Sequence, residues 1–113
     1  HGMAPLVSHV YELGLVEAIS IPQTECFDSA LKFARTEGIV PAPEPTHALA
    51  AAIREAMACK ESGEEKVILT ALCGHGHLDL AAYDKFLAGG MVDLDLSDAV
   101  IAQAMQQVPD IDA

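Results

Sequence analysis

The chain has 113 residues, of which 51% are hydrophobic and 20% are charged, a composition typical of a folded domain rather than a disordered segment. Its 17 acidic residues against six basic ones give a formal net charge of -11, which argues against binding to nucleic acid or anionic membranes, because both need clustered Lys and Arg. Three cysteines without paired spacing argue against a disulfide framework, and no apolar run reaches the roughly 18 residues that span a membrane, so we expect a cytoplasmic protein.

Helical and strand patterns alternate in the first third of the chain. Apolar residues at spacings of four and three after Pro5 predict a short helix that ends at Gly14. The apolar, β-branched run 16–21 predicts a first strand. A helix is predicted over 24–36, with Thr24 as its N-cap, because apolar side chains then gather on one face.

The same alternation continues to the end of the chain. Three prolines make residues 39–45 a stiff, extended connection that excludes regular helix and central strand. An Ala-rich helix is predicted over 46–62, followed by a strand over 66–72 that is nearly all apolar and so is expected to be covered on both faces. Two further helices are predicted over 79–87 and 97–107.

The element order α-β-α-α-β-α-α predicts an α/β fold in which helices cover a parallel sheet in three layers. Two strands alone make a poor sheet, so residues 1–113 are expected to be a single domain that forms part of a larger sheet. The first residue is His1 rather than Met, which fits either a piece of a longer protein or N-terminal processing. Sheet edges and apolar faces left uncovered in such a piece predict self-association into a homo-oligomer.

The loop Cys73–His77 is the first candidate site, because ligands bind at the carboxyl ends of strands in open parallel sheets. Gly74 and Gly76 would let the backbone approach a ligand closely, or would allow a tight turn without any ligand. His75 and His77 are two residues apart, a spacing that suits a metal, but no further ligand is suitably spaced and we assign no metal site.

The second candidate is Glu44, which the proline-rich segment would hold in a set position. The carboxylate falls just before a predicted helix start, where the helix dipole favours negative charge. From the residues alone, helix capping is the simpler interpretation and a catalytic role stays open. His47 follows in the first helical turn and is expected to be structural or on the surface.

Together the two segments resemble the tryptophan synthase β-chain family. Residues 37–50 are similar to that family's EGI-PA-E--HA segment, and residues 67–76 are similar to its strand that ends in LSGxG. The proline before Glu44 and the sequence GHGHLDLAAY over 74–83 resemble the second group of these chains. The similarity runs in order over nearly the whole chain.

The resemblance implies the C-terminal portion of a fold-type-II enzyme that depends on pyridoxal 5'-phosphate (PLP). Such an enzyme is a lyase of tryptophan and amino-acid biosynthesis that joins L-serine and indole to give L-tryptophan and water. Glu44 would then be the catalytic glutamate that assists loss of the substrate hydroxyl. Cys73 stands where the family has the Ser that contacts the pyridine nitrogen of PLP. The cofactor-binding turn would continue through Gly74, His75 and Gly76.

The family's Schiff-base lysine and glycine-rich phosphate loop have no counterpart in the matching region. We therefore predict that the isolated chain is inactive and does not bind PLP, and that its partner is the remainder of the parent enzyme. Two alternatives stay open. One is a fragment of a PLP enzyme that resembles serine or threonine dehydratases, and the other is a stand-alone interaction module that self-associates.

Overall fold

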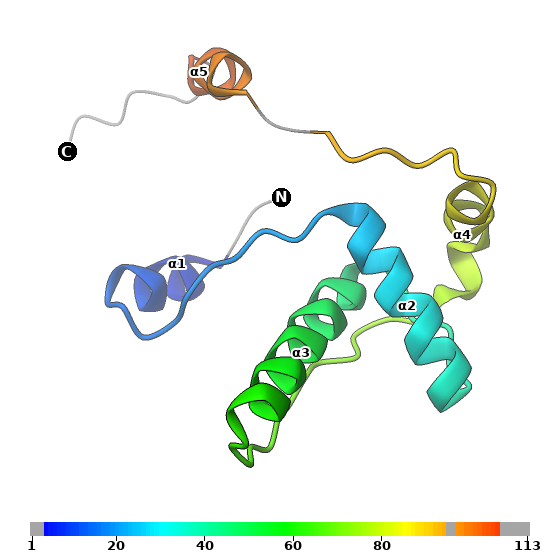
Figure 1. Ribbon diagram of the computed structural model, residues 1–113. Helices are drawn as coiled ribbons and strands as arrows, with labels where there is room; N and C mark the ends of the chain where they lie inside the picture. The colour runs from blue at the N-terminus through cyan, green and yellow to red at the C-terminus, as the bar shows by residue number, and fades with distance from the viewer. Residues whose placement is uncertain (1–3, 95–96, 107–113) are drawn as a thin grey trace.

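A computed structural model of the protein describes residues 4–94 and 97–106, and helices make up its regular structure (Figure 1). In chain order the elements are α1 (Pro5–Glu12), α2 (Gln23–Glu37), α3 (Pro43–Ser62), the 3-10 helix η1 (Gly76–Leu78), α4 (Leu80–Leu87) and α5 (Asp98–Met105). No strand forms within these residues, where the extended backbone pairs only as one isolated antiparallel bridge between Pro41 and His75.

The prediction of a three-layer α/β fragment with a parallel sheet is wrong. The predicted strands 16–21 and 66–72 are both irregular. A strand forms only when a neighbouring segment shares its backbone hydrogen bonds, and neither segment has such a neighbour in the described part of the chain. Val67 and Leu69 are 99% and 95% exposed, so the second of these segments is not covered on both faces.

The predicted helices form, with one shifted boundary. Helices α1, α2 and α4 lie within about two residues of their predicted positions, which is the usual uncertainty of a helix end. Helix α5 forms within the predicted range 97–107, whose last residue lies outside the described residues. Helix α3 begins three residues earlier than predicted, at Pro43. Proline suits the first turn of a helix, because the amide that it lacks would have no partner there. Gly38 and Gly63 end α2 and α3 in the left-handed conformation, with φ of 70° and 74°.

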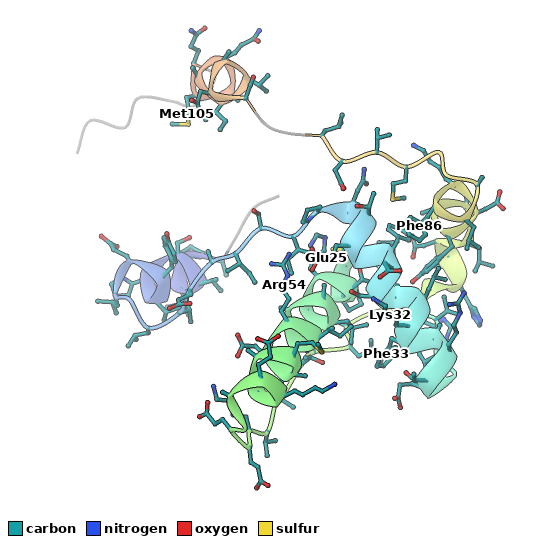
Figure 2. All side chains as sticks on the ribbon, viewed as in Figure 1. Glu25, Lys32, Phe33, Arg54, Phe86 and Met105 are labelled. Atoms are coloured by element: carbon teal, nitrogen blue, oxygen red, sulfur yellow. The ribbon has the colours of Figure 1, made fainter. Side chains whose placement is uncertain are left out.

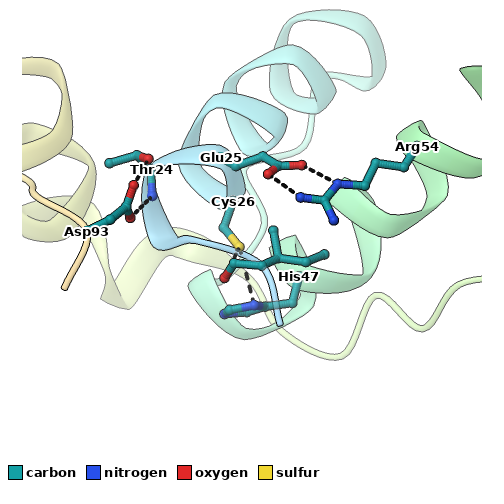
Figure 3. A network of polar contacts seen from close by, with 7 residues as sticks. Thr24, Glu25, Cys26, His47, Arg54 and Asp93 are labelled. Atoms are coloured by element: carbon teal, nitrogen blue, oxygen red, sulfur yellow. Dashed lines mark hydrogen bonds and ion pairs between the residues drawn. The ribbon is translucent and has the colours of Figure 1, made fainter. Parts of the chain in front are cut away.

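Helix α2 packs against α3 along one side. Cys26 of α2 is buried with Ile21 and Ala50, and these three residues form one core cluster. Across the same interface Arg54 of α3 donates from Nε and Nη2 to the two carboxylate oxygens of Glu25, at 2.7 and 2.5 Å (Figure 3). Such a two-bond arrangement adds geometric specificity to the packing of the two helices.

Helix α2 also packs against α4, through aromatic side chains. Phe27 and Ala30 of α2 are buried with Tyr83 of α4. The ring of Phe27 meets that of Tyr83 edge to face at a centroid distance of 5.0 Å, and it stacks on Phe86 at 5.5 Å. Aromatic pairs in these geometries add stability beyond the area that they bury.

Helices α1 and α5 stand apart from the packed helices α2, α3 and α4, as Figures 1 and 2 show. Neither of the two helices contains a buried residue. The radius of gyration is 17.1 Å, against about 13 Å for a compact domain of this length. Apolar side chains such as Leu6, Ile101 and Met105 are therefore left exposed. No helix among the described residues is long and apolar enough to cross a membrane.

The segment 91–94 caps the N-terminal end of α2. The amide of Thr24 donates to a carboxylate oxygen of Asp93 at 3.0 Å, and the Thr24 hydroxyl donates to the other oxygen (Figure 3). Gln23 donates from its side-chain amide to the carbonyl of Val92 at 2.5 Å. Thr24 is the second residue of the helix rather than its N-cap, and Asp93, 69 residues further along the chain, supplies the acceptor.

The stability of this arrangement should fall at acid pH. Hydrogen bonds from Thr24 lower the pKa of Asp93 below its ordinary value of 3.8, and the hydrogen bond from Arg54 lowers the pKa of Glu25 below 4.5. A carboxyl group whose pKa is lower in the folded chain stabilises the fold above its unfolded pKa, and this contribution is lost as pH falls through the folded pKa. We therefore expect the free energy of unfolding to fall between about pH 5 and about pH 2.

Urea unfolding followed by circular dichroism at several pH values measures this loss. Asp93→Asn keeps an acceptor oxygen for Thr24 but cannot titrate, so its unfolding free energy should depend less steeply on pH. The control is Asp84→Asn, which removes an exposed carboxylate from α4. Equal pH slopes for Asp93→Asn and the unmodified chain would contradict the role of Asp93.

Candidate functional site

The two segments that the sequence singles out lie side by side. The amide of Ala42 donates to the carbonyl of Gly74 at 2.9 Å, and the amide of Gly76 donates to the carbonyl of Val40 at 2.8 Å. These two bonds flank the bridge between Pro41 and residue 75. The proline-rich segment is thereby held in a fixed antiparallel register against the loop that begins at residue 73.

Gly74 and Gly76 make this close approach possible. A Cβ atom on Gly76 would lie 2.5 Å from the carbonyl oxygen of Pro41 and 2.7 Å from a methyl group of Val40. A Cβ atom on Gly74 would lie 2.8 Å from that of Ala42. Carbon atoms pack at about 3.5–4.0 Å, so neither position has room for a side chain. From sequence these glycines serve a ligand or a tight turn, and in the structure they also admit the chain's own backbone.

Tyr83 of α4 fixes the proline-rich segment from another side. Its hydroxyl donates to the carbonyl oxygen of Pro41 at 2.5 Å, and both side chains are buried. Burial raises the pKa of the Tyr83 phenol, which keeps the hydroxyl protonated and able to donate. No local sequence pattern assigns a role to Tyr83, although a buried phenol generally needs a hydrogen-bond partner.

Glu44 lies in the first turn of α3 and its side chain is exposed. It borders an open groove of about 540 Å³ between the N-terminal ends of α2 and α3. The residues that line this groove are Gln23, Cys26, Phe27, Pro43, Glu44 and His47. The position in the first turn favours a negative charge on Glu44, because the helix dipole places a partial positive charge at this end of α3.

His47 lies one turn after Glu44 and borders the same groove. Its Nδ1 atom is 3.3 Å from the Sγ atom of Cys26 on α2 (Figure 3). Cys26 is only 1% exposed and burial raises the pKa of its thiol, so this cysteine is a neutral hydrogen-bonding group rather than a nucleophile. No sequence pattern predicts this contact, because it joins residues 21 positions apart on two helices.

The remaining candidates lie on the exposed side of the loop. Cys73 is an exposed, free thiol. The rings of His75 and His77 lie 4.0 Å apart, and Nδ1 of His75 accepts a hydrogen bond from the amide of His77 at 3.2 Å. Over residues 4–94 and 97–106, no three His, Cys, Asp or Glu side chains come together in a way that could hold a metal ion.

Two of the four lysines are paired with carboxylates on the surface. Lys32 pairs with Asp28 on the surface of α2 at 2.6 Å. Lys66 pairs with Glu64 at 3.0 Å, just after α3. None of the chain's lysines borders the groove beside Glu44.

The chain is similar to several known tryptophan synthase beta chains. No family model matches the chain. It is 61% identical over 93 residues to tryptophan synthase beta chain 2 of Aquifex aeolicus, which covers 82% of this chain and 21% of that protein. The identity to tryptophan synthase beta chain 2 of Methanosarcina acetivorans is 54% over 92 residues, which cover 81% of this chain and 21% of that protein. The Pyrococcus furiosus protein of the same name is 44% identical over 109 residues, which cover 96% of this chain and 24% of that protein. The chain spans about a fifth of the length of these relatives.

Proposed function

The chain belongs to the tryptophan synthase beta chain 2 family, and from this relationship we propose that it is the C-terminal part of a PLP-dependent lyase. The complete enzyme would join L-serine and indole to give L-tryptophan and water. One observation carries the proposal: the two segments whose sequences resemble the family, around Glu44 and Cys73, are bonded to each other through the backbone of residues 40–42. The rest of the enzyme, in the cytoplasm, would be the chain's partner.

The residues present fit one edge of a PLP site. Cys73 has an exposed thiol, and the Gly74 carbonyl beside it is fixed by the amide of Ala42. A thiol is a weak, neutral donor that suits the ring nitrogen, and the loop through His75 and Gly76 would shape the ring's surroundings. When bound, PLP withdraws electrons from the amino-acid substrate, and a neutral group at its nitrogen tempers this pull and favours replacement at the β carbon.

Glu44 would move the proton that the reaction needs. Its carboxyl group gives a proton to the hydroxyl oxygen of L-serine, which then leaves as water. The same carboxylate takes back a proton when indole loses one from its ring, so the group is unchanged after each cycle. The groove beside Glu44 is open, and His47 borders it one turn further along α3. The open groove supports the proposal that a substrate can reach the carboxyl group of Glu44 directly.

A chimeric enzyme tests the proposed function. The 93 matching residues of the Aquifex aeolicus protein are replaced by those of this chain, and tryptophan formation from L-serine and indole is measured. We expect the chimera to make tryptophan. A folded chimera that holds PLP and makes none would contradict the proposal. Release of pyruvate from L-serine with no tryptophan formed when indole is present would favour the dehydratase-like alternative instead.

The isolated chain should not bind PLP covalently at one defined site. No lysine borders the groove beside Glu44, and Lys32 and Lys66 are paired with carboxylates on the surface. Without a lysine beside the ring and without a phosphate loop, PLP would have only weak contacts. We therefore expect borohydride reduction after incubation with PLP to label several lysines at low occupancy. Mass spectrometry that finds one lysine labelled stoichiometrically would contradict this prediction.

The isolated chain should also form a homo-oligomer. Helices α1 and α5 bury no residue, and large apolar side chains such as Leu6, Leu69 and Leu94 are exposed. Apolar surface of this extent is normally covered by a partner. The charge of -11 opposes association, but salt at about 0.15 M screens charges beyond about 8 Å. Sedimentation equilibrium at micromolar concentration measures the mass, and a strictly monomeric species would contradict the prediction.

A further inference from the structure

We infer that Tyr83 is the positioning residue of the candidate site, because its hydroxyl fixes the carbonyl of Pro41 and thereby the pairing of residues 40–42 with the loop at 74–76. The consequence for catalysis rests on the proposed function, whereas the consequence for the pairing does not. Tyr83 itself would not touch substrate. It would act through the backbone that carries Glu44 on one side and Cys73 on the other.

The position of the Tyr83 ring is set by its neighbours in the core. The side chain is only 5% exposed, and Phe27 meets it edge to face at an interplanar angle of 70°. The ring is attached to α4, which begins directly after the loop. Because the ring has little freedom, its hydroxyl reaches one acceptor, the carbonyl oxygen of Pro41 at 2.5 Å.

The bond from Tyr83 is the hydrogen bond that holds the backbone of Pro41 in place. Proline has no amide hydrogen, so its carbonyl is its only backbone hydrogen-bonding group. Pro41 is fully buried, and Tyr83 is the donor to its carbonyl among the described residues. A buried carbonyl that loses its donor is strongly unfavourable, because water cannot replace the bond. Without the hydroxyl, the segment is expected to move until its carbonyl reaches solvent.

Such a movement would break the pairing on both sides of Pro41. Val40 and Ala42 hold the two backbone bonds to the loop, and they are the immediate neighbours of Pro41. Glu44 follows three residues later and Cys73 precedes the loop's paired residues. The distance between these two candidate groups therefore depends on Tyr83, which acts on both through the backbone.

Amide hydrogen exchange of the isolated chain tests the pairing directly. In Tyr83→Phe, the amides of Ala42 and Gly76 should exchange about tenfold faster or more, because the opened state becomes more populated. The matched control is Tyr11→Phe, which alters the chain's other tyrosine on the exposed helix α1 and should leave these rates unchanged. The amide of Arg54 in the middle of α3 serves as the internal reference.

Wild-type exchange rates at Ala42 and Gly76 would overturn the inference. An equal acceleration at Arg54 would also overturn it, because the substitution would then act on global stability. In the chimeric enzyme, Tyr83→Phe should lower kcat about tenfold and change the KM for L-serine by less than about twofold, because misplaced groups slow chemistry more than binding. An unchanged kcat would refute the catalytic consequence. An inactive chimera with Tyr83 intact would refute the proposed function and leave the exchange result to stand.

Discussion

Glu44→Gln in the chimeric enzyme is expected to lower the turnover of L-serine and indole by about 10²–10⁴-fold, the usual contribution of a proton-transferring side chain. Glutamine has nearly the same shape and keeps an acceptor oxygen, so the substitution removes little except the ability to give and take a proton. The groove beside Glu44 stays open, and binding of L-serine should change far less than kcat. Steady-state kinetics with both substrates measures the two effects separately.

Glu37→Gln is the matched control. Glu37 lies at the end of α2, is exposed, and belongs to the same family-like segment as Glu44. Its replacement should leave turnover within about twofold of the unmodified chimera, as is usual for surface positions. If Glu44→Gln behaved like this control, Glu44 would be a helix-stabilising carboxylate and nothing more. The capping interpretation predicts a loss of about 0.3–1 kcal/mol in stability and no loss in kcat.

The helices could be predicted from sequence because their signals are local. Apolar residues at helical spacing placed α2 and α4, and Gly38 and Gly63 marked the ends of α2 and α3. The predicted start of α3 is three residues too late. A proline breaks the interior of a helix but is favourable in its first turn, and Pro43 occupies that turn.

The strands could not be predicted correctly from the same kind of signal. Residues 66–72 have the apolar, β-branched composition of a buried strand, but composition supplies no hydrogen-bonding neighbour. Whether a segment becomes a strand depends on a second segment elsewhere in the chain, and no pattern within residues 66–72 reports on it. The predicted sheet therefore fails while the helices around it form.

The sequence singled out the segments of the candidate site but not the contacts between them. The family resemblance singled out Glu44 and Cys73, and the structure brings the segments that carry them together. Tyr83 and Cys26 were not singled out, because their partners Pro41 and His47 lie 42 and 21 residues away. Contacts at such separations are fixed by helix packing, which a single sequence read locally does not reveal.

Gly76→Ala should destabilise the isolated chain by about 1–3 kcal/mol, the range for a side chain forced into filled space. The added methyl group would lie 2.5 Å from the carbonyl oxygen of Pro41 and 2.7 Å from Val40. The nearer of these atoms belongs to the backbone and cannot rotate away. The paired segments would have to separate, which would also break the bond from the Gly76 amide to Val40.

Two other glycines set the scale for this prediction. Gly74→Ala should destabilise the chain less, because its methyl group meets only the Cβ of Ala42, at 2.8 Å. Gly90→Ala should be nearly neutral, because its nearest neighbours lie at an ordinary 3.5 Å and its φ is not positive. Thermal and urea unfolding followed by circular dichroism rank the three variants. Equal losses at Gly90 and Gly76 would show that both substitutions act through the lost flexibility of the glycine backbone. They would refute the conclusion that close packing against residues 40–42 requires Gly76.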